Sequence, residues 1–534
     1  MDEIDGIVAG FRPVSETAEA VAAPFRRLTD PAYADGIGVP RASPVAADRV
    51  AFEVFSQGDV AIPNPYDLSA LWIFWGQFVD HDLDLAPEQE GAGAELLKPD
   101  PQFPVVRSER VEGTGEDGVP REQPNAVTPL MDGSQIYGSD RERLEALRTG
   151  EGGRLATAPG EDGIALLPDA EQVFGPDSEE EGFVAGDIRA RENSGLTALH
   201  TVFLNEHNHW ADRFAAEHPD WSDEQIFQNA RAAVETLLQK ITYAEFLPIL
   251  VGDALPAYAG FDPSVDPQVT TEFATAGFRF GHTAIPDVFT FPAEDGAPEG
   301  PPLPLFRAFE SDTVIEERGA GALLRGLLEE RAQRLDAKVV DSLNFLLFTP
   351  DGGLTGFSLP ERNILRGRDH GIEGWLAVRE AVVGDVDAEA LAGSRDFSVI
   401  TSDPALQDAL ARVHPTLGNV DLWTGGLAED HAPGTTLGPT FRAIVAEQFA
   451  ATRDGDPLFY LGRDWTDEAV FEELMNTALS DVLMRSGGVE HVQRSAMLAS
   501  ERIGGTDARD YLKGAEGRDL LIGFDGPDML RGRE

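Results

Sequence analysis

The stretch from Leu68 to Asp84 constrains this chain more than any other. An apolar run, LSALWIF, continues into WGQFVDHDLD, so a segment with the composition of a buried helix ends in a histidine between two carboxylates. Burying ionised groups is costly unless they are paired or bind a metal ion. The pattern favours a metal site, a proton-transfer site, or both side by side. Taken alone, Asp-His-Asp is explained equally well by a solvated helix end.

Composition narrows the classes of partner. The 534-residue chain has 42 Lys and Arg against 94 Asp and Glu, a net charge of −52. Nucleic acids and anionic membranes would repel such a chain, whereas calcium or a saline medium would suit it. The chain has no cysteine, which excludes disulfides, thiolate metal sites and thiol catalysis. Its length fits roughly two to four domains, or one large helical domain.

The N-terminus and the hydropathy pattern bear on localisation. The first residues, MDEIDGIVAGF, have neither a basic region nor a long apolar core, so no cleavable signal peptide is predicted there. No stretch reaches 18 apolar residues, and no transmembrane helix is expected.

Apolar residues at helical spacing predict a mainly α body with long connecting loops. Pro- and Gly-rich segments at 86–124, 150–186 and 286–304 read as loops, and few alternating strands occur before residue 500. Asp67 is the expected N-cap of the first helix. Helices are predicted over residues 67–81, 139–148, 196–217, 222–243, 318–346, 371–382 and 438–451.

The C-terminal tail has a different pattern. GGTDARDYL, KGAEGRDLL and IGFDGPDML repeat with a period of nine, which brings Asp510, Asp519 and Asp528 into register. Such glycine- and aspartate-rich nonapeptides are typical of a calcium-binding parallel β-roll, and the three aspartates are the expected ligands. An acidic disordered tail is the alternative. Because the repeats stop abruptly, we expect the natural chain to be longer.

Three further clusters carry chemically useful groups, and each has a purely structural alternative. Residues 186–193 (GDIRAREN) include Arg189 and Glu192, which could form a surface salt bridge. Residues 278–282 (FRFGH) end in His282, a metal or haem ligand or a structural histidine. Residues 363–371 (NILRGRDHG) could serve an anionic cofactor or form an internal salt-bridge network.

Together these clusters resemble the animal-type haem peroxidases, the peroxidase–cyclooxygenase superfamily, from about residue 33 to about residue 490. The shared motifs, in family order, are WGQFVDHDLDLAP, TPLMDGSQIYGS, LTALHTVFLNEHNHWA, FRFGH, LPERNILRGRDHG, GNVDLWTGGLAE and GPTFRAIVAEQFAATRDGDPLFY. The resemblance implies a mainly α, haem peroxidase-like helical domain over residues 61–495. An N-terminal segment, 1–60, would wrap it, and a truncated calcium-binding repeat segment would occupy 503–534.

The resemblance also implies the roles of individual residues. His81 is similar to the distal histidine, Gln77 lies beside it, and Arg189 is similar to the distal arginine. His282 is similar to the proximal iron ligand, whose other ring nitrogen would donate to Asn363. The remaining haem contacts implied are propionate partners and carboxylates that form ester bonds to haem methyl groups, namely Arg279 and Arg366, and Asp80 and Glu192.

A calcium site is implied next to the distal histidine. Its oxygen ligands would come from side chains and from one backbone carbonyl, the preference of Ca²⁺. They are Asp82, Thr128, Leu130 (through its carbonyl), Asp132 and Ser134. Because Asp82 follows His81 directly, the ion would help to hold the histidine in place.

The implied function is a haem b-dependent peroxidase. It would reduce hydrogen peroxide via compound I and oxidise iodide, bromide, thiocyanate or phenols. Asn193 follows Glu192, where myeloperoxidase has a methionine joined to the haem through a sulfonium bond. An asparagine cannot form that bond, which makes chloride the least favoured halide.

Three alternatives stay open. The first is a peroxidase that oxidises manganese(II), a cation suited to an acidic surface. The second is a fatty-acid dioxygenase of the cyclooxygenase branch, although Arg279 stands where that branch has its radical-forming tyrosine. The third is a non-enzymatic, calcium-dependent surface or adhesion module. The repeat tail and the N-terminus favour a bacterial protein exported to the extracellular medium by a one-step system that reads a C-terminal signal.

Overall fold

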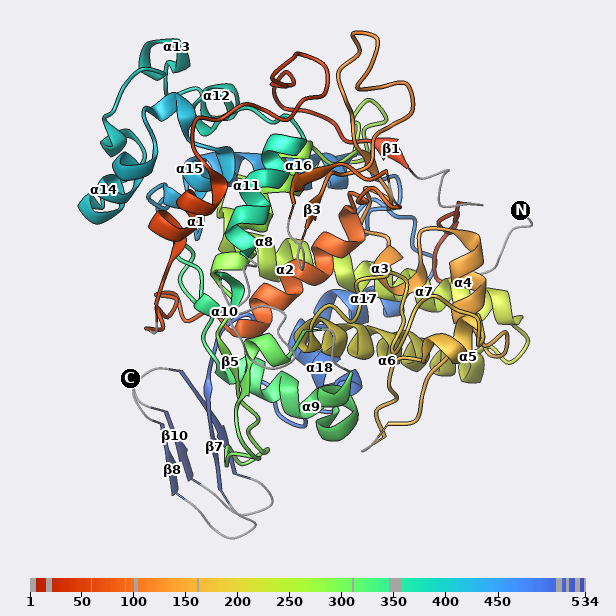
Figure 1. The fold of residues 1–534 in the computed structure, drawn as a ribbon. Coiled ribbons are helices and arrows are strands. Elements are labelled where there is room, and N and C mark those ends of the chain that lie inside the picture. Colours follow the sequence, from red (N-terminus) through yellow and green to blue (C-terminus); the bar gives the residue numbers. More distant parts are fainter. Residues whose placement is uncertain are drawn as a thin grey trace.

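The computed structural model describes residues 6–15, 22–58, 60–91, 93–99, 104–160, 163–309, 312–344, 358–505, 511–514, 518–523 and 529–532. Helices dominate these residues, as the sequence predicts, and long irregular segments join them (Figure 1). The first nine helices are α1 (Ala47–Phe55), α2 (Ala70–Leu83), α3 (Ser134–Tyr137), α4 (Arg141–Leu147), α5 (Ala170–Phe174), α6 (Ser194–Glu217), α7 (Asp223–Ile241), α8 (Leu247–Val251) and α9 (Thr313–Glu329).

The second half of the chain is also helical. It contributes α10 (Asp341–Asn344), α11 (Leu359–Asp369), α12 (Trp375–Val382), α13 (Ala388–Leu391), α14 (Pro404–Val413), α15 (Leu422–Ala428), α16 (Pro439–Asp454), α17 (Glu468–Asn476) and α18 (Leu479–Ser486). Short π and 3₁₀ turns lie between α7 and α9, among them η2 (Thr242–Phe246), η3 (Phe273–Gly277) and η4 (Arg279–Thr283).

Helix α2 lies in the middle of the fold. It is buried from Ala70 to Leu83 except at two partly exposed positions, Gln77 and Asp80. The expected N-cap is wrong: Ser69 caps the helix by accepting from the Trp72 amide at 3.3 Å. Asp67 instead has a left-handed φ of 54° and pairs with Arg331 at 3.1 Å. Ser69 is fully buried, and its hydroxyl also donates to the Ala496 carbonyl at 2.7 Å, so this residue joins the helix start to a distant segment.

Helices α6 and α7 pack together as a long pair, and α2 packs against α6 (Figure 1). Asn193 caps α6, and Ser222 with Gln225 forms a reciprocal capping box at the start of α7. Helix α6 touches α2, α7, α9 and α18 and lies at the centre of the core. Its approach to α2 is close, since a β-carbon at Gly195 would lie 2.8 Å from the Phe74 ring.

Two predicted helices have different bounds. The helix expected over 318–346 begins at Thr313 and ends at Glu329, and the chain is then irregular up to α10. The helix expected over 371–382 is α12, which starts only at Trp375 and ends at Val382 as expected. A separate helix, α11, ends at Asp369 just before it, and Gly371 between the two adopts a φ of 62°. Left-handed glycine ends a helix because it carries no β-carbon to clash there.

The N-terminal segment runs against distant parts of the chain. The amide of Ile7 donates to Asn229 of α7 at 2.6 Å, and Arg12 pairs with Asp456 at 2.8 Å. Further along, β1 (Ala23–Pro24) pairs with β4 (Pro124–Asn125). The other strands of the body are equally short, namely β2 (Leu96–Lys98), β3 (Val105–Val106), β5 (Val288–Phe289) and β6 (Leu303–Pro304).

The C-terminal tail extends from the helical body as two small parallel sheets (Figure 1). Strand β7 (Glu501–Gly504) pairs with β9 (Asp519–Ile522), and β8 (Tyr511–Lys513) pairs with β10 (Met529–Arg531). Partners in both sheets are 18 residues apart, which is two nonapeptide repeats. This is the parallel pairing that the repeat predicts. Asp519 lies in β9, whereas Asp510 and Asp528 lie outside the described residues.

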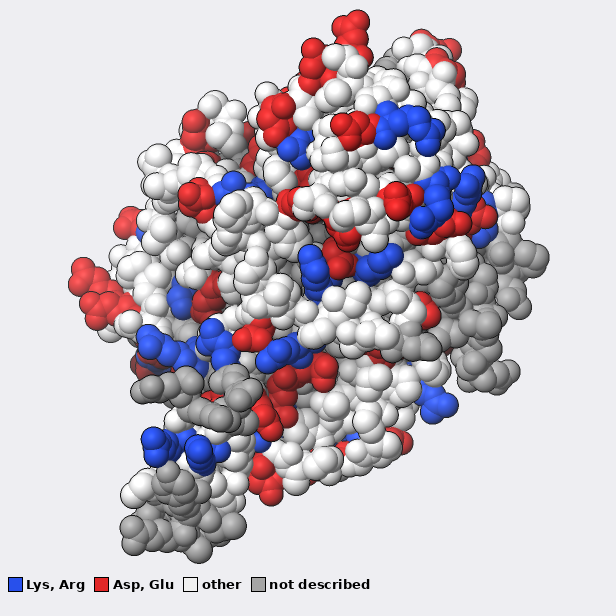
Figure 2. Space-filling view, turned by 90° about the vertical axis from the view of Figure 1, so that its left-hand side faces the viewer, with Lys and Arg blue, Asp and Glu red and all other residues white. Residues whose placement is uncertain are grey.

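The surface carries both signs of charge. On the face shown in Figure 2, Asp and Glu gather in several groups with Lys and Arg between them, and the described part of that face has no continuous basic area. Among the described residues, no helix has the length and apolarity needed to span a membrane.

Candidate functional site

A cavity of about 400 Å³ opens beside the C-terminal half of α2. This volume is in the range of small-molecule and cofactor pockets. Most of the haem-site residues predicted from the sequence line it, together with apolar side chains. Those residues are Gln77, Asp80, His81, Arg189, Glu192, Arg279, His282 and Arg366. Segments far apart in sequence therefore meet at one place.

Arg189 is held rigidly at this cavity. Its Nε and Nη2 donate to the two carboxylate oxygens of Asp187 at 2.9 and 2.8 Å, and Nη2 also donates to the carbonyl of Asp84 at 2.9 Å. Burial opposes the ionisation of Asp187, but the charge and hydrogen bonds of Arg189 hold its pKa well below the ordinary value. The Nη1 group of Arg189 makes no hydrogen bond to any described residue, so this donor remains for a ligand.

His81 lies between two carboxylates. Its Nδ1 is 3.8 Å from Asp187 Oδ1, and its Nε2 is 3.7 Å from Glu192 Oε2. Burial and the nearby charge of Arg189 lower the pKa of His81 well below its ordinary value. The imidazole is therefore neutral at physiological pH and can accept a proton.

The carboxylates of α2 that face the cavity share their environment. Burial raises the pKa of Asp80 to about 6 against the opposing charges of Arg189 and Arg279. Burial and the neighbouring Asp80 raise the pKa of Asp84 well above its ordinary value. The Oδ2 atom of Asp84 is buried without a hydrogen-bond partner. The two groups, Asp80 in the last turn of α2 and Asp84 at its C-cap, therefore resist being ionised together.

His282 and Asn363 meet as the sequence predicts, but with the opposite polarity. The Nδ2 atom of Asn363 is 2.9 Å from His282 Nδ1, so the amide nitrogen, not the expected oxygen, faces the ring. Arg279 explains this, because its Nη1 donates to Asn363 Oδ1 at 3.4 Å and a guanidinium can only donate. Burial and Arg279 lower the pKa of His282 to about 3, which leaves the imidazole neutral.

The two arginines predicted to bind propionates differ in their pairing. Arg279 makes no ion pair within 4 Å of a described residue, and its Nε donates to the carbonyl of Ala274 at 2.8 Å. Arg366 already pairs with Glu88, and its Nη1 lies 3.3 Å from Asp369 Oδ2. Arg279 is therefore the freer cation at the cavity.

The predicted calcium ligands lie together behind the cavity. Asp82 accepts from the Ser134 amide at 2.7 Å and from its hydroxyl at 2.9 Å, and Asp132 accepts from the same amide at 3.1 Å. Thr128 Oγ1 lies 3.5 Å from the carbonyl oxygen of Leu130. Burial and the nearby Asp132 raise the pKa of Asp82 well above its ordinary value. Two buried carboxylates this close call for a cation.

No group of three or more His, Asp or Glu side chains is arranged around a metal position within the described ranges. The Asp82 cluster has only two carboxylates, and its other oxygens belong to hydroxyl and carbonyl groups. Such a mixed set is typical of calcium rather than of transition metals.

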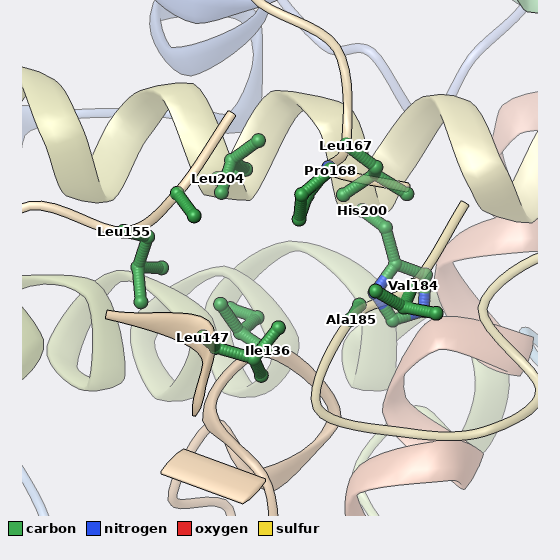
Figure 3. Close-up of a pocket in the computed structure, with 10 residues that line it drawn as sticks. Ile136, Leu147, Leu155, Leu167, Pro168, Val184, Ala185, His200 and Leu204 are labelled. Atoms are coloured by element: carbon green, nitrogen blue, oxygen red, sulfur yellow. The ribbon is translucent and has the colours of Figure 1, made fainter. Parts of the chain in front are cut away.

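A second, much smaller pocket lies beside α6 (Figure 3). Its volume of about 10 Å³ leaves room for about one water molecule. Aliphatic side chains surround it, together with His200, and neither ring nitrogen of His200 has a hydrogen-bond partner. The ring packs edge-on against Phe78 at 4.9 Å. This pocket cannot hold a cofactor, and the larger cavity is the functional candidate.

The sequence prediction missed Asp187 and Asp84. Asp187 orients Arg189 and lies next to His81, and Asp84 contributes both a carbonyl and a carboxyl group. Two signals were available. Asp187 stands two residues before Arg189, within reach across a turn, and Asp84 is four residues after Asp80, just beyond the end of the predicted helix.

Comparison with known proteins identifies relatives of this chain. The profile of the family described as animal haem peroxidase matches residues 13–497. Peroxinectin A of Dictyostelium discoideum is 32% identical over 492 residues, covering 87% of this chain and 89% of that protein. Thyroid peroxidase of Sus scrofa is 33% identical over 537 residues; the match covers 88% of this chain but 58% of that longer protein.

Solved structures agree with this result. Peroxidase A from Dictyostelium discoideum superposes with a TM-score of 0.79 at 30% identity, covering 90% of this chain and 96% of that one. A fatty acid alpha-dioxygenase from Oryza sativa gives a TM-score of 0.68, covering 92% of this chain and 89% of that one. At 17% identity, the second match shows a shared fold alone.

We predict that His200→Phe stabilises the protein. The change removes a buried polar group without partners and keeps a ring of similar shape, so the free energy of unfolding should rise by roughly 1–3 kcal/mol at pH 7. Burial lowers the pKa of His200 to about 3. The unfolded state therefore binds the proton first as the pH falls below about 6.5, and the advantage of the variant should grow by roughly 2 kcal/mol at pH 5.

Urea denaturation at both pH values measures this effect. His207→Phe is the matched control, because His207 is equally buried but bonded to the Tyr137 hydroxyl at 3.0 Å and the Gly153 carbonyl at 2.9 Å. That variant should be less stable than the wild type at pH 7. A His200→Phe protein that is also destabilised at pH 7 would contradict this prediction.

Proposed function

Since this chain belongs to the animal haem peroxidase family, a family of oxidoreductases that act on peroxide, we propose that it binds haem b in the cavity beside α2. There it would reduce hydrogen peroxide and oxidise a small electron donor. The observation that carries the proposal is the meeting of His81, Arg189 and His282 at one cavity of cofactor size. A pure binding module has no need of this combination.

The lining of the cavity fits the group. Trp72, Ile73, Phe280 and other apolar side chains suit a flat macrocycle, and Arg279 is a cation without a carboxylate partner within 4 Å among the described residues. The indole Nε1 of Trp72 and His81 Nδ1 are buried without hydrogen-bond partners. A bound planar cofactor with two carboxylates would use the cation and enclose these polar atoms.

Bound haem would supply an iron centre that takes two oxidising equivalents from peroxide and passes them to a donor. The residue that would hold the iron is His282, through Nε2, because its imidazole is neutral. That role needs the ring proton on Nδ1, so the Asn363 amide would have to turn its oxygen to this atom. The turn gives up the 3.4 Å contact with Arg279, which is at the long end of hydrogen bonding.

His81 and Arg189 would act on peroxide. His81 Nε2, being neutral, would take the proton from one peroxide oxygen and return it to the oxygen that leaves. The free Nη1 of Arg189 would donate to that second oxygen as negative charge builds on it. Since Asp187 already fixes the guanidinium, little reorganisation is needed when the charge develops.

The donors we propose are iodide, bromide, thiocyanate and phenols, and chloride is disfavoured because Asn193 offers no sulfur for a bond to the haem. Manganese(II) remains a second donor candidate. Steady-state assays with each donor would rank them. Oxygen uptake with a fatty acid in the absence of peroxide would instead indicate the dioxygenase alternative. Export to the extracellular medium remains a prediction from the repeat tail.

We predict that His81→Leu leaves haem bound but slows the reaction with peroxide by roughly 10²–10⁴-fold, the usual contribution of a general acid–base group. Stopped-flow absorbance of the reconstituted protein gives this rate, and the Soret band shows haem occupancy. His209→Leu changes the same residue type at an exposed position of α6 and should react like the wild type. A His81→Leu protein that reacts at the wild-type rate would remove His81 from the mechanism.

Asp80 and Glu192 are proposed to tether the haem through ester bonds. Both carboxylates line the cavity. Each would replace one hydrogen of a haem methyl group, with peroxide taking up the two electrons released. After treatment with peroxide, acid–acetone should leave haem attached to the wild-type protein and release it from the Asp80→Asn/Glu192→Gln variant. Complete release from the wild type would refute the tether.

We further propose that Ca²⁺ binds behind the cavity through Asp82, Asp132, Ser134, Thr128 and the Leu130 carbonyl. The support is the pair of buried carboxylates, of which Asp82 forms no ion pair with Lys or Arg within 4 Å among the described residues. Their raised pKa values mean that, without a cation, ionising both carboxylates lowers the stability of the folded protein. The calcium role of the tail aspartates also remains a prediction, for Asp519 as for Asp510 and Asp528.

Calcium should therefore stabilise the holoprotein, by about 2.7 kcal/mol at a concentration 100 times the dissociation constant. Asp82→Asn should abolish most of this effect, because it removes one of the two charges that bind the ion. Thermal unfolding with Ca²⁺ and with a chelator measures it. Asp519→Asn, in strand β9, is the control for calcium binding in the tail. This variant should still be stabilised by Ca²⁺ through the site in the helical body. An Asp82→Asn protein as calcium-responsive as the wild type would contradict the assignment.

A further inference from the structure

The side-chain amide of Asn193 has its orientation set by helix α6. As the N-cap, Asn193 accepts from the Leu196 amide through Oδ1 at 2.9 Å. Only the oxygen of an amide side chain can accept this bond. The Nδ2 group must therefore point away from the helix, and the side chain, which is 3% exposed, has little freedom to turn.

The orientation of Asn193 sets that of Gln77. Asn193 Nδ2 donates to Gln77 Oε1 at 2.9 Å, and because Nδ2 can only donate, Gln77 must present its oxygen. The Nε2 group of Gln77 then faces away from Asn193 and makes no hydrogen bond to any described residue. Gln77 lines the cavity and is four residues before His81 on the same face of α2. Both N–H groups of Nε2 are thus left for a ligand in the cavity.

We propose that Asn193 is a positioning residue for the donor side of the reaction, an inference that rests on the proposed peroxidase function. Because its own amide is oriented by the N-terminus of α6, Asn193 fixes the orientation of the Gln77 amide through one hydrogen bond. The N–H groups of Gln77 then face the cavity beside His81. We call this pair of hydrogen bonds the relay. A small anion there meets two hydrogen-bond donors. If the amide were reversed, the anion would meet a carbonyl oxygen, which repels it.

The relay gives Asn193, the residue after Glu192, a role in orienting the Gln77 amide. An asparagine at that position cannot bond to haem, but it reaches across from α6 to α2 and couples the two helices through one amide pair. Without Asn193, the two orientations of Gln77 would differ little in energy, and the amide would populate both. Small anions would then bind less tightly because only part of the population offers donors.

The test is a double-substitution cycle on the haem-loaded protein with azide as the anionic probe. Asn193→Ser keeps an N-cap of equal quality but lacks the Nδ2 donor, and Gln77→Met keeps the length of the side chain without its amide. Azide affinity follows from the shift of the Soret band. Asn193→Ser should weaken it about fivefold, the value of one ordinary hydrogen bond, and Gln77→Met by at least as much. The double variant should bind azide no more weakly than Gln77→Met alone.

Each outcome has one meaning. Effects that simply multiply in the double variant, or an Asn193→Ser protein with wild-type affinity, would overturn the relay. An unchanged thermal midpoint in Asn193→Ser shows that the cap is intact, so a loss of affinity is not a loss of fold. A wild-type protein that binds haem and turns over peroxide supports the proposed function whatever the azide cycle shows. A wild-type protein without a Soret band would instead contradict the proposed function itself.

Discussion

The burial of the polar end of α2 is the constraint on which the rest of this structure depends. The helix is apolar for three turns and then places His81 and several carboxylates inside the protein. Buried charges without partners are among the costliest features a fold can contain. Neighbouring segments offset this cost by supplying hydrogen-bond donors. Arg189, from the turn before α6, donates to the Asp84 carbonyl, and the 128–134 loop supplies the amide and hydroxyl of Ser134 to Asp82.

These partners divide the end of α2 into three electrostatic environments. Towards the loop, Asp82 and Asp132 form an acidic pair suited to a cation. In the middle, His81 is kept neutral by burial and by Arg189. Towards the cavity, Asp80 is partly compensated by guanidinium groups at a distance. Under the proposed function, this one helical turn would bind a metal ion, exchange a proton and anchor the cofactor, and Arg189 influences both the proton-exchanging and the anchoring group.

The fold could be read from the sequence where local signals were strong. The helices predicted over 196–217 and 222–243 from apolar periodicity are α6 (Ser194–Glu217) and α7 (Asp223–Ile241), with ends displaced by no more than two residues. The N-cap of α2 could not be predicted in this way, since Ser69 and Asp67 are both good caps and only the fold brings the Ala496 carbonyl to the Ser69 hydroxyl. The end of α9 at Glu329 was also missed, because the apolar pattern continues beyond it while the backbone turns extended at Glu330.

The sequence by itself determined which family motifs supply the main residues of the candidate site. The order and spacing of its motifs single out His81, Arg189 and His282, because the same residue types recur there in one family. Only the tertiary structure decided how these groups are held. Asp187 is the anchor of Arg189, Asn363 turns its amide towards Arg279, and a helix cap on α6 orients Gln77 on α2. The reason is physical: a motif specifies which side chains are present, whereas the direction of a hydrogen bond depends on which donors and acceptors the folded chain brings within about 3 Å of each other.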